Sequence, residues 1–298
     1  MTLVALAPSE VLTFGLSFFR IDSKKWTEKK RNEEFKKLYG SYAHVIAMIW
    51  IDLLQMSMCD GQEQDEKSFK RFMVAIFYLW ARPKNSTILA ASMDILERDA
   101  RGAALWDSIQ HIAMLQKSKI DSTLNMDEVY AISADGVDFK LWEKKHPRYN
   151  IDKQACSHKF NSCAAKYLIA LKLQESKCVF IAGPYIGGVS DAQMMVDSGL
   201  QKLLVEKKKV VIVDRGFYSD NAAHRETHAY PDEIDEPQLH KFKSRARLRH
   251  ETFNGRLKYF AIMEQTFKHG FKKHKIAFEA VVVIVQYQME NGYPLFSI

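Results

Sequence analysis

Two aspartates stand where short strands are expected to end. Asp135 follows the β-prone run Val129–Ala134, Asp214 follows the apolar run Lys209–Val213, and each has a glycine one or two positions later. Strand ends are favoured catalytic positions in α/β folds, because rigid backbone stops there and side chains meet solvent. Two carboxylates on neighbouring strands repel one another unless a divalent cation lies between them. The pair therefore predicts a site for Mg²⁺, which prefers carboxylate oxygens and retains waters beside a phosphate.

A third carboxylate, Glu251, is the candidate that completes this site. It is the one acid in the strongly basic segment 245–258, whose charge would hold DNA phosphates beside it. Asn254 and Lys258 fall on the same helical face, at i+3 and i+7. Each acid taken singly is better explained as a turn residue or an ion-pair partner. The three taken together favour the metal site.

The positive charge of the chain is concentrated near its C-terminal end. Its 298 residues include 43 Lys and Arg against 36 Asp and Glu, a net charge of +7. Residues 241–298 hold eleven basic and four acidic residues, so this segment carries the whole excess. Such a segment suits a polyanion such as nucleic acid, and a solvated helix face is the alternative.

The composition excludes several classes of protein. A hydrophobic share of 47% excludes disorder for the bulk of the chain. The four cysteines form no CxxC pair, which argues against a zinc ribbon and a disulfide scaffold. The most apolar run, Ala277–Met289, is short and carries Glu279, so we expect a buried helix and no membrane partner.

Residues 1–120 are expected to be helical. Their apolar residues recur at helical spacing, as in Ser68–Ala81. A segment resembling a helix-turn-helix is expected over about residues 68–117. Its second helix, Ile95–Leu115, would follow a tight turn. An ordinary pair of short helices is the alternative.

Residues 121–298 are expected to form an α/β domain. Short β-prone runs alternate with helical segments there, and Phe217–His240 is expected to be a loop. The expected strands are Val129–Ala134, Tyr167–Leu173, Cys178–Ala182 and Lys209–Val213, and the expected helices are Asp191–Leu204, Phe242–Phe267 and Ile276–Glu290. The sequence thus predicts a helical region over 1–120 and a second domain over 121–298.

Three segments resemble the catalytic blocks of a DDE transposase, in the order of that family. They are Ser133–Phe139, Val213–Phe217 and Arg249–Lys258. The PIF/Harbinger group, whose nuclease domain is related to that of IS5 elements, resembles the chain most closely. The likeness covers roughly residues 127–298 and is weaker over 60–120. Val137 and Phe217 depart from the family pattern, and neither departure removes a metal ligand.

The resemblance implies a ribonuclease H-like nuclease domain. Asp135, Asp214 and Glu251 would be its catalytic residues and would hold two Mg²⁺ (or Mn²⁺) ions for water attack on a DNA phosphodiester. A freed 3′-hydroxyl would then attack target DNA. The residues expected to contact DNA are Arg247, Arg249, Asn254, Arg256 and Lys258.

The same resemblance implies partners and a location. DNA (terminal inverted repeats and target), further copies of the chain and a separate Myb-like DNA-binding protein are the expected partners, and the nucleus is the expected location. Asp138 and Asp191 are reserve carboxylates, and His250 either supports the site or is a structural histidine.

Two other functions are considered beside the nuclease. One is a transposase-derived DNA-binding protein that no longer cuts, against which the intact acids argue. The other is a different metal-dependent hydrolase, such as a phosphatase with strand-end aspartates. That class would need a dedicated nucleophile and a phosphate loop, and it gives no reason for a basic helix around Glu251.

Overall fold

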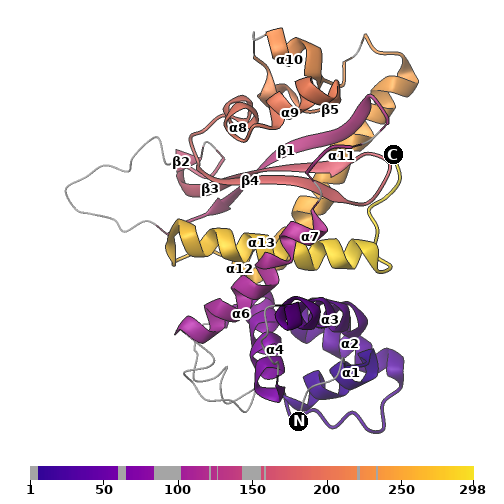
Figure 1. Cartoon of the computed structure of the whole chain (residues 1–298), viewed down its shortest axis with the longest axis vertical. Helices are drawn as coiled ribbons and strands as arrows, with labels where there is room; N and C mark the ends of the chain where they lie inside the picture. The colour runs from indigo at the N-terminus through magenta and orange to yellow at the C-terminus, as the bar shows by residue number, and fades with distance from the viewer. Residues whose placement is uncertain are drawn as a thin grey trace, which may run out of the picture. The chain divides into compact units, whose positions relative to one another are not determined.

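A computed structural model describes residues 6–59, 65–83, 102–120, 122–125, 127–142, 156–157, 159–219, 222–232 and 234–298 (Figure 1). The chain divides into two compact units. Unit 1 comprises Met1–Lys117, Lys258–Glu264 and Ile276–Asn291, and unit 2 comprises Ser118–Leu257, Gln265–Lys275 and Gly292–Ile298. The division expected at residue 120 stays a prediction, and the units also place two segments from the second expected domain with the N-terminal helices.

Unit 1 is built from helices. They are α1 (Pro8–Ser17), α2 (Glu28–Tyr39), α3 (Ala43–Cys59), α4 (Glu66–Ala81), α6 (Gly102–Met114), the short α12 (Ala261–Glu264), most of α13 (Gly270–Glu290) and the first half of the short α7 (Gln116–Lys119). Asp65 caps α4 by accepting a hydrogen bond from Ser68 N at 2.8 Å. The expected helix-turn-helix depends on residues 84–101, which lie outside the described residues, and it stays a prediction.

The apolar helix α13 is buried. Residues 281–285 of this helix are all fully buried. Tyr287 donates a hydrogen bond to Asp52 of α3, and Gln288 Nε2 donates to Gly40 O at 3.0 Å. The apolar C-terminal run is thus a core helix, as expected. None of the described helices is long and apolar enough to cross a membrane.

Unit 2 is built around one mixed sheet. Its strands are β1 (Tyr130–Lys140), β2 (Cys156–Ser157), β3 (Ser162–Lys172), β4 (Cys178–Ile186), β5 (Val210–Ile212) and β6 (His228–Ala229). The order is β2-β3-β1-β5-β6, with β4 also paired to β3. Strand β3 is antiparallel to β1 and β4, whereas β5 is parallel to β1 and β6. Strand β1 is therefore central, with an antiparallel neighbour on one side and a parallel one on the other.

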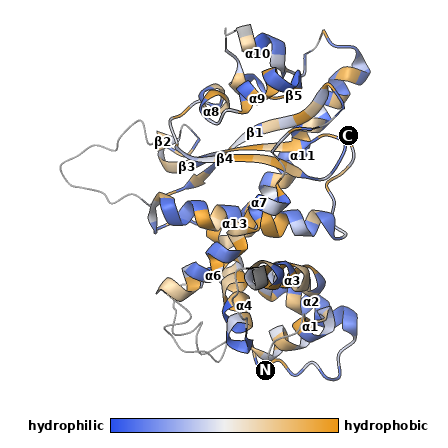
Figure 2. Ribbon diagram, in the orientation of Figure 1, coloured by the Kyte–Doolittle hydropathy of each residue, from blue (hydrophilic) through white to orange (hydrophobic). Residues whose placement is uncertain are grey.

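Helices cover both faces of this sheet. Those of unit 2 are α8 (Asp191–Asp197), α9 (Leu200–Lys207), α10 (Ala222–Thr227) and most of α11 (Pro237–Tyr259). Val211 and Val213 pack into a core that includes residues of α8 and α9, whereas Ile212 packs with Ala246 of α11. Strand β5 is thus apolar throughout because both of its faces are buried. Figure 2 shows the contrast between this strand core and the largely hydrophilic α11.

Four details of the expected organisation are wrong. The helix expected over Phe242–Phe267 is divided, because α11 ends at Tyr259 and α12 follows. Strand β1 does not end before Asp135 but runs on to Lys140, because its later residues also pair with β3. The expected loop Phe217–His240 contains α10, β6 and the start of α11. The expected helix Asp191–Leu204 is two helices, interrupted where Gly199 takes a φ of 77° that favours glycine.

Candidate active site

Asp135 lies in the middle of β1, with its side chain toward α11. It pairs with Ile169 of β3. Two residues earlier, Ser133 Oγ is hydrogen-bonded to His250 Nε2 at 2.9 Å. Asn254, one turn further along α11, donates from Nδ2 to Asp135 Oδ2 at 2.9 Å. Because alternate residues of a strand share a face, these two bonds fix α11 along β1 and hold the Asp135 carboxylate.

Asp214 lies near Asp135, two residues after the end of the neighbouring strand β5. Ser133 pairs with Ile212 in the parallel β1–β5 ladder. Asp135 and Asp214 each come two residues after this pair. The Asp214 side chain caps a short 3₁₀ turn by accepting a hydrogen bond from Gly216 N at 2.8 Å. Its Oδ2 is 3.7 Å from an Arg247 guanidinium nitrogen. The sheet thus brings together the two aspartates that the sequence predicts.

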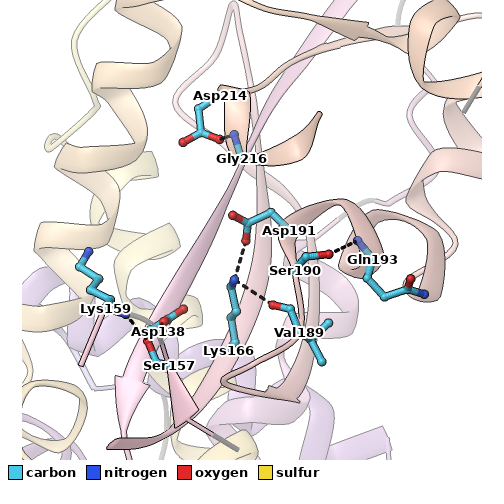
Figure 3. Close-up of polar contacts among 10 residues, drawn as sticks. All are labelled: Asp138, Ser157, Lys159, Lys166, Val189, Ser190, Asp191, Gln193, Asp214 and Gly216. Carbon is cyan, nitrogen blue, oxygen red and sulfur yellow. Dashed lines mark hydrogen bonds and ion pairs between the residues drawn. The ribbon is translucent and has the colours of Figure 1, made fainter. Parts of the chain in front are cut away.

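Asp191, the first residue of α8, adds a third carboxylate (Figure 3). A Cβ atom at Gly136 would lie 2.2 Å from Asp191 Oδ1, and one at Gly216 would lie 3.2 Å from Asp191 Oδ2. The absence of side chains at these two glycines therefore makes room for this carboxylate. Lys166 of β3 pairs with it, with Nζ 2.9 Å from Oδ1.

The carboxylates of the site are crowded. Burial raises the pKa of Asp135 to about 6, and the charges of Asp214 and Asp191 add to that effect. Burial also raises the pKa of Asp191, and the nearby charge of Lys166 lowers that pKa by a smaller amount. Within the described residues, no three His, Cys, Asp or Glu side chains form a preformed metal cluster. The oxygen donors and their mutual repulsion nevertheless fit a hard divalent cation, which would favour the ionised forms.

Glu251 is not joined to this group. It is exposed on α11, one turn before Asn254. No hydrogen bond or ion pair in the described part of the chain links it to Asp135 or Asp214. Its spacing of three residues from Asn254 makes the two side chains neighbours on the helix surface. Its role as the third catalytic acid stays a prediction.

Comparison with known proteins places this chain in a family. The DDE superfamily endonuclease family matches residues 134–286, just over half of the chain. The chain belongs to this family. The matched segment of this DDE family member contains Asp135, Asp191, Asp214 and Glu251. No match was found among curated proteins or among solved structures.

Two of the arginines expected to contact DNA instead bind backbone carbonyls of this DDE domain. Arg249 is buried and donates hydrogen bonds to the carbonyls of Lys172, Leu173 and Glu175 around the β3–β4 turn. Arg256 donates to the carbonyls of Tyr293 and Pro294 in the C-terminal segment. Both guanidinium groups are thus bound to backbone of the fold, and contact of either residue with DNA stays a prediction.

The other three expected DNA-contacting residues differ in position. Arg247 is exposed beside Asp214, with its side chain 48% accessible. Asn254 is committed to Asp135, and Lys258 is partly buried in unit 1. Of these three, Arg247 is the one whose charged group is exposed beside Asp214, and its contact with DNA stays a prediction.

Arg247 and Arg249 form a matched pair for a stability test. Arg249→Met is expected to lower the free energy of unfolding by about 2 kcal/mol, because three buried or partly buried carbonyls lose their donor. Arg247→Met is expected to change it by less than about 0.5 kcal/mol, as at most exposed positions. Urea unfolding followed by circular dichroism measures both. Equal losses in the two variants would contradict the structural role of Arg249.

A cleft of about 350 Å³ adjoins the DDE site. It is lined by Gly136, Asp138, Lys159, Lys166, Gly187, Gly188, Val189, Ser190, Asp191 and Gly216. Ser157 donates a hydrogen bond to Asp138 in its wall. Lys166 was not among the residues singled out from the sequence, although a lone lysine at the start of an apolar strand is the kind of signal that could have found it.

Proposed function

We propose that this chain is a DDE transposase of the PIF/Harbinger type. It would cut DNA phosphodiester bonds at the ends of an element and join the freed 3′-hydroxyl to target DNA. The observation that carries this proposal is the closeness of Asp135, on strand β1, to Asp214, which follows the end of the parallel neighbouring strand β5. The family match supports a nuclease with DNA as its substrate.

The proposed reaction depends on divalent cations, Mg²⁺ or Mn²⁺, with two ions at the site. When bound, they supply an activated water and charge stabilisation at the leaving oxygen. Asp135, Asp214 and Glu251 are the proposed ligands. Asn254 fixes the orientation of the Asp135 carboxylate, and the backbone N–H of Gly216 fixes that of Asp214. Arg247 would hold a DNA phosphate beside Asp214.

The fold and the partners are proposed on the same basis. The mixed sheet with Asp135 on its central strand supports a ribonuclease H-like assignment. Assembly with further copies of the chain, a separate Myb-like DNA-binding partner and a nuclear location rest on the resemblance of the three catalytic blocks.

Nicking of supercoiled plasmid DNA tests the proposed activity without knowledge of the element ends. We expect nicked circles in Mg²⁺ or Mn²⁺ and none when the cation is removed with EDTA. The affinity for the plasmid DNA would be measured in parallel, and we expect it to fall steeply as the salt concentration rises. Salt-sensitive binding with no nicking in either cation would contradict the nuclease and favour the DNA-binding protein that no longer cuts.

A further inference from the structure

The cleft beside Asp191 has walls that a DNA strand can approach closely. Four of its residues are glycines, and Gly187 and Gly188 form the turn that leads into α8. A ligand can reach backbone at such positions because no side chain intervenes. The cleft adjoins the catalytic carboxylates, since Gly216 both lines it and donates its N–H to Asp214. Its volume suits one nucleotide unit and excludes a duplex.

Lys166 is held in this cleft as a cation with spare bonding capacity. Its Nζ lies 2.9 Å from Asp191 Oδ1 and donates to Val189 O at 3.0 Å, and its side chain is only 13% accessible (Figure 3). The contact with Asp191 is an ion pair and the one with Val189 O is a hydrogen bond, so an ammonium group with three hydrogens keeps a donor for a ligand. A buried cation needs a negative partner, which Asp191 supplies.

The charges of the cleft balance in this arrangement. Lys159 and Lys166 are offset by Asp138 and Asp191, so the cleft has no excess positive charge for a phosphate. A divalent cation at the carboxylates would change the balance, because it would take over the neutralisation of Asp191. Lys166 would then be available to a new anion.

We propose that this cleft holds one nucleotide of a DNA strand by its phosphate, with Lys166 transferring from Asp191 to that phosphate when a divalent cation binds. The inference rests on the proposed nuclease function and adds a binding site for the strand beside the acids. It makes strand binding and cation binding cooperative, with Lys166 as the residue that couples them.

The test measures binding of a fluorescent single-stranded oligonucleotide by anisotropy, in EDTA and in Ca²⁺, another cation that prefers carboxylate oxygens. Wild-type protein should bind about tenfold more tightly in Ca²⁺, the size expected for one hydrogen bond to a charged group. Lys166→Met should lose most of this gain. Lys202→Met is the matched control, because Lys202 is 81% accessible on α9 and should keep it.

Asp191→Asn separates the proposal from a simple loss of folding. Neutralising this carboxylate releases Lys166, so the variant should bind the oligonucleotide in EDTA about as tightly as wild-type protein binds it in Ca²⁺. Poor folding cannot produce that gain. Unchanged or weaker binding by Asp191→Asn in EDTA, or a full Ca²⁺ gain in Lys166→Met, would overturn the proposal.

Plasmid nicking by the wild-type protein distinguishes a failure of the cleft proposal from a failure of the proposed nuclease function. If wild-type protein nicks DNA but Asp191→Asn shows no gain in binding, the cleft proposal fails and the proposed function stands. If wild-type protein neither nicks DNA nor binds the oligonucleotide in Ca²⁺, both fail.

Discussion

Asp214→Asn is expected to reduce cation-dependent plasmid nicking by about 10³-fold or more. A metal-bound carboxylate contributes through several kcal/mol of transition-state stabilisation, which corresponds to a rate effect of this size. The substitution keeps the shape of the side chain and leaves an oxygen to accept from Gly216 N, so the turn after β5 should persist. Initial nicking rates in Mn²⁺ measure the effect, and Asp197→Asn, at an exposed position of α8, is the control.

The same assay identifies the third acid of the site. Glu251→Gln is expected to cause a loss similar to that of Asp214→Asn, as the resemblance to DDE transposases implies. A full loss in Asp191→Asn with near-normal nicking by Glu251→Gln would contradict this and assign the third position to Asp191. Activity within about threefold of wild type in Asp214→Asn would contradict the catalytic site as a whole.

Asp135→Asn is expected to stabilise the cation-free protein, by about 3 kcal/mol near pH 8. Burial and the neighbouring carboxylates raise the pKa of Asp135 to about 6 in the folded protein, from its ordinary value of 3.8. A carboxyl whose pKa is higher in the folded than in the unfolded protein makes its full contribution to the free energy of unfolding at pH values below the unfolded pKa. That contribution is lost as the pH rises through the pKa of the folded protein. Above about pH 6 the ionised side chain therefore opposes folding, and the neutral amide does not.

Urea unfolding in EDTA, at several pH values, measures this effect as the difference between variant and wild type. The advantage of Asp135→Asn should shrink to about half near pH 5, where much of the wild-type carboxyl is protonated. His228 and His250, whose pKa values burial lowers to about 4, destabilise both proteins equally in acid and cancel in the difference. A difference that is constant with pH, or a less stable variant, would contradict the crowded carboxylate.

The sequence predicted the site best where a residue type and a strand pattern coincided. The apolar run before Asp214 and the β-prone run before Asp135 were enough to predict both acids next to strands, and the parallel β1–β5 pairing brings them together. The full length of β1 was not predictable from the run alone. It depends on pairing of residues 135–140 with β3, a non-local contact that local propensity does not report.

Charge alone was a poorer guide to the roles of individual residues. Arg247 and Arg249 are two positions apart on one basic helix, yet one is exposed and the other is buried and binds three backbone carbonyls. Helical spacing sets which side chains share a face, but the position of the β3–β4 turn decides which arginine is buried. Likewise, the space between Gly136 and Gly216 that receives Asp191 exists only once distant segments have packed.

The position of Mn²⁺, located by anomalous diffraction from crystals soaked in the ion, tests the central claim most directly. It requires neither the DNA ends nor a partner protein. We predict anomalous density between the carboxylates of Asp135 and Asp214, with Glu251 or Asp191 turned toward it. Carboxylates that remain without an ion at high Mn²⁺ concentration, or density confined to other acidic residues, would contradict the account of this chain as a cation-dependent DDE nuclease.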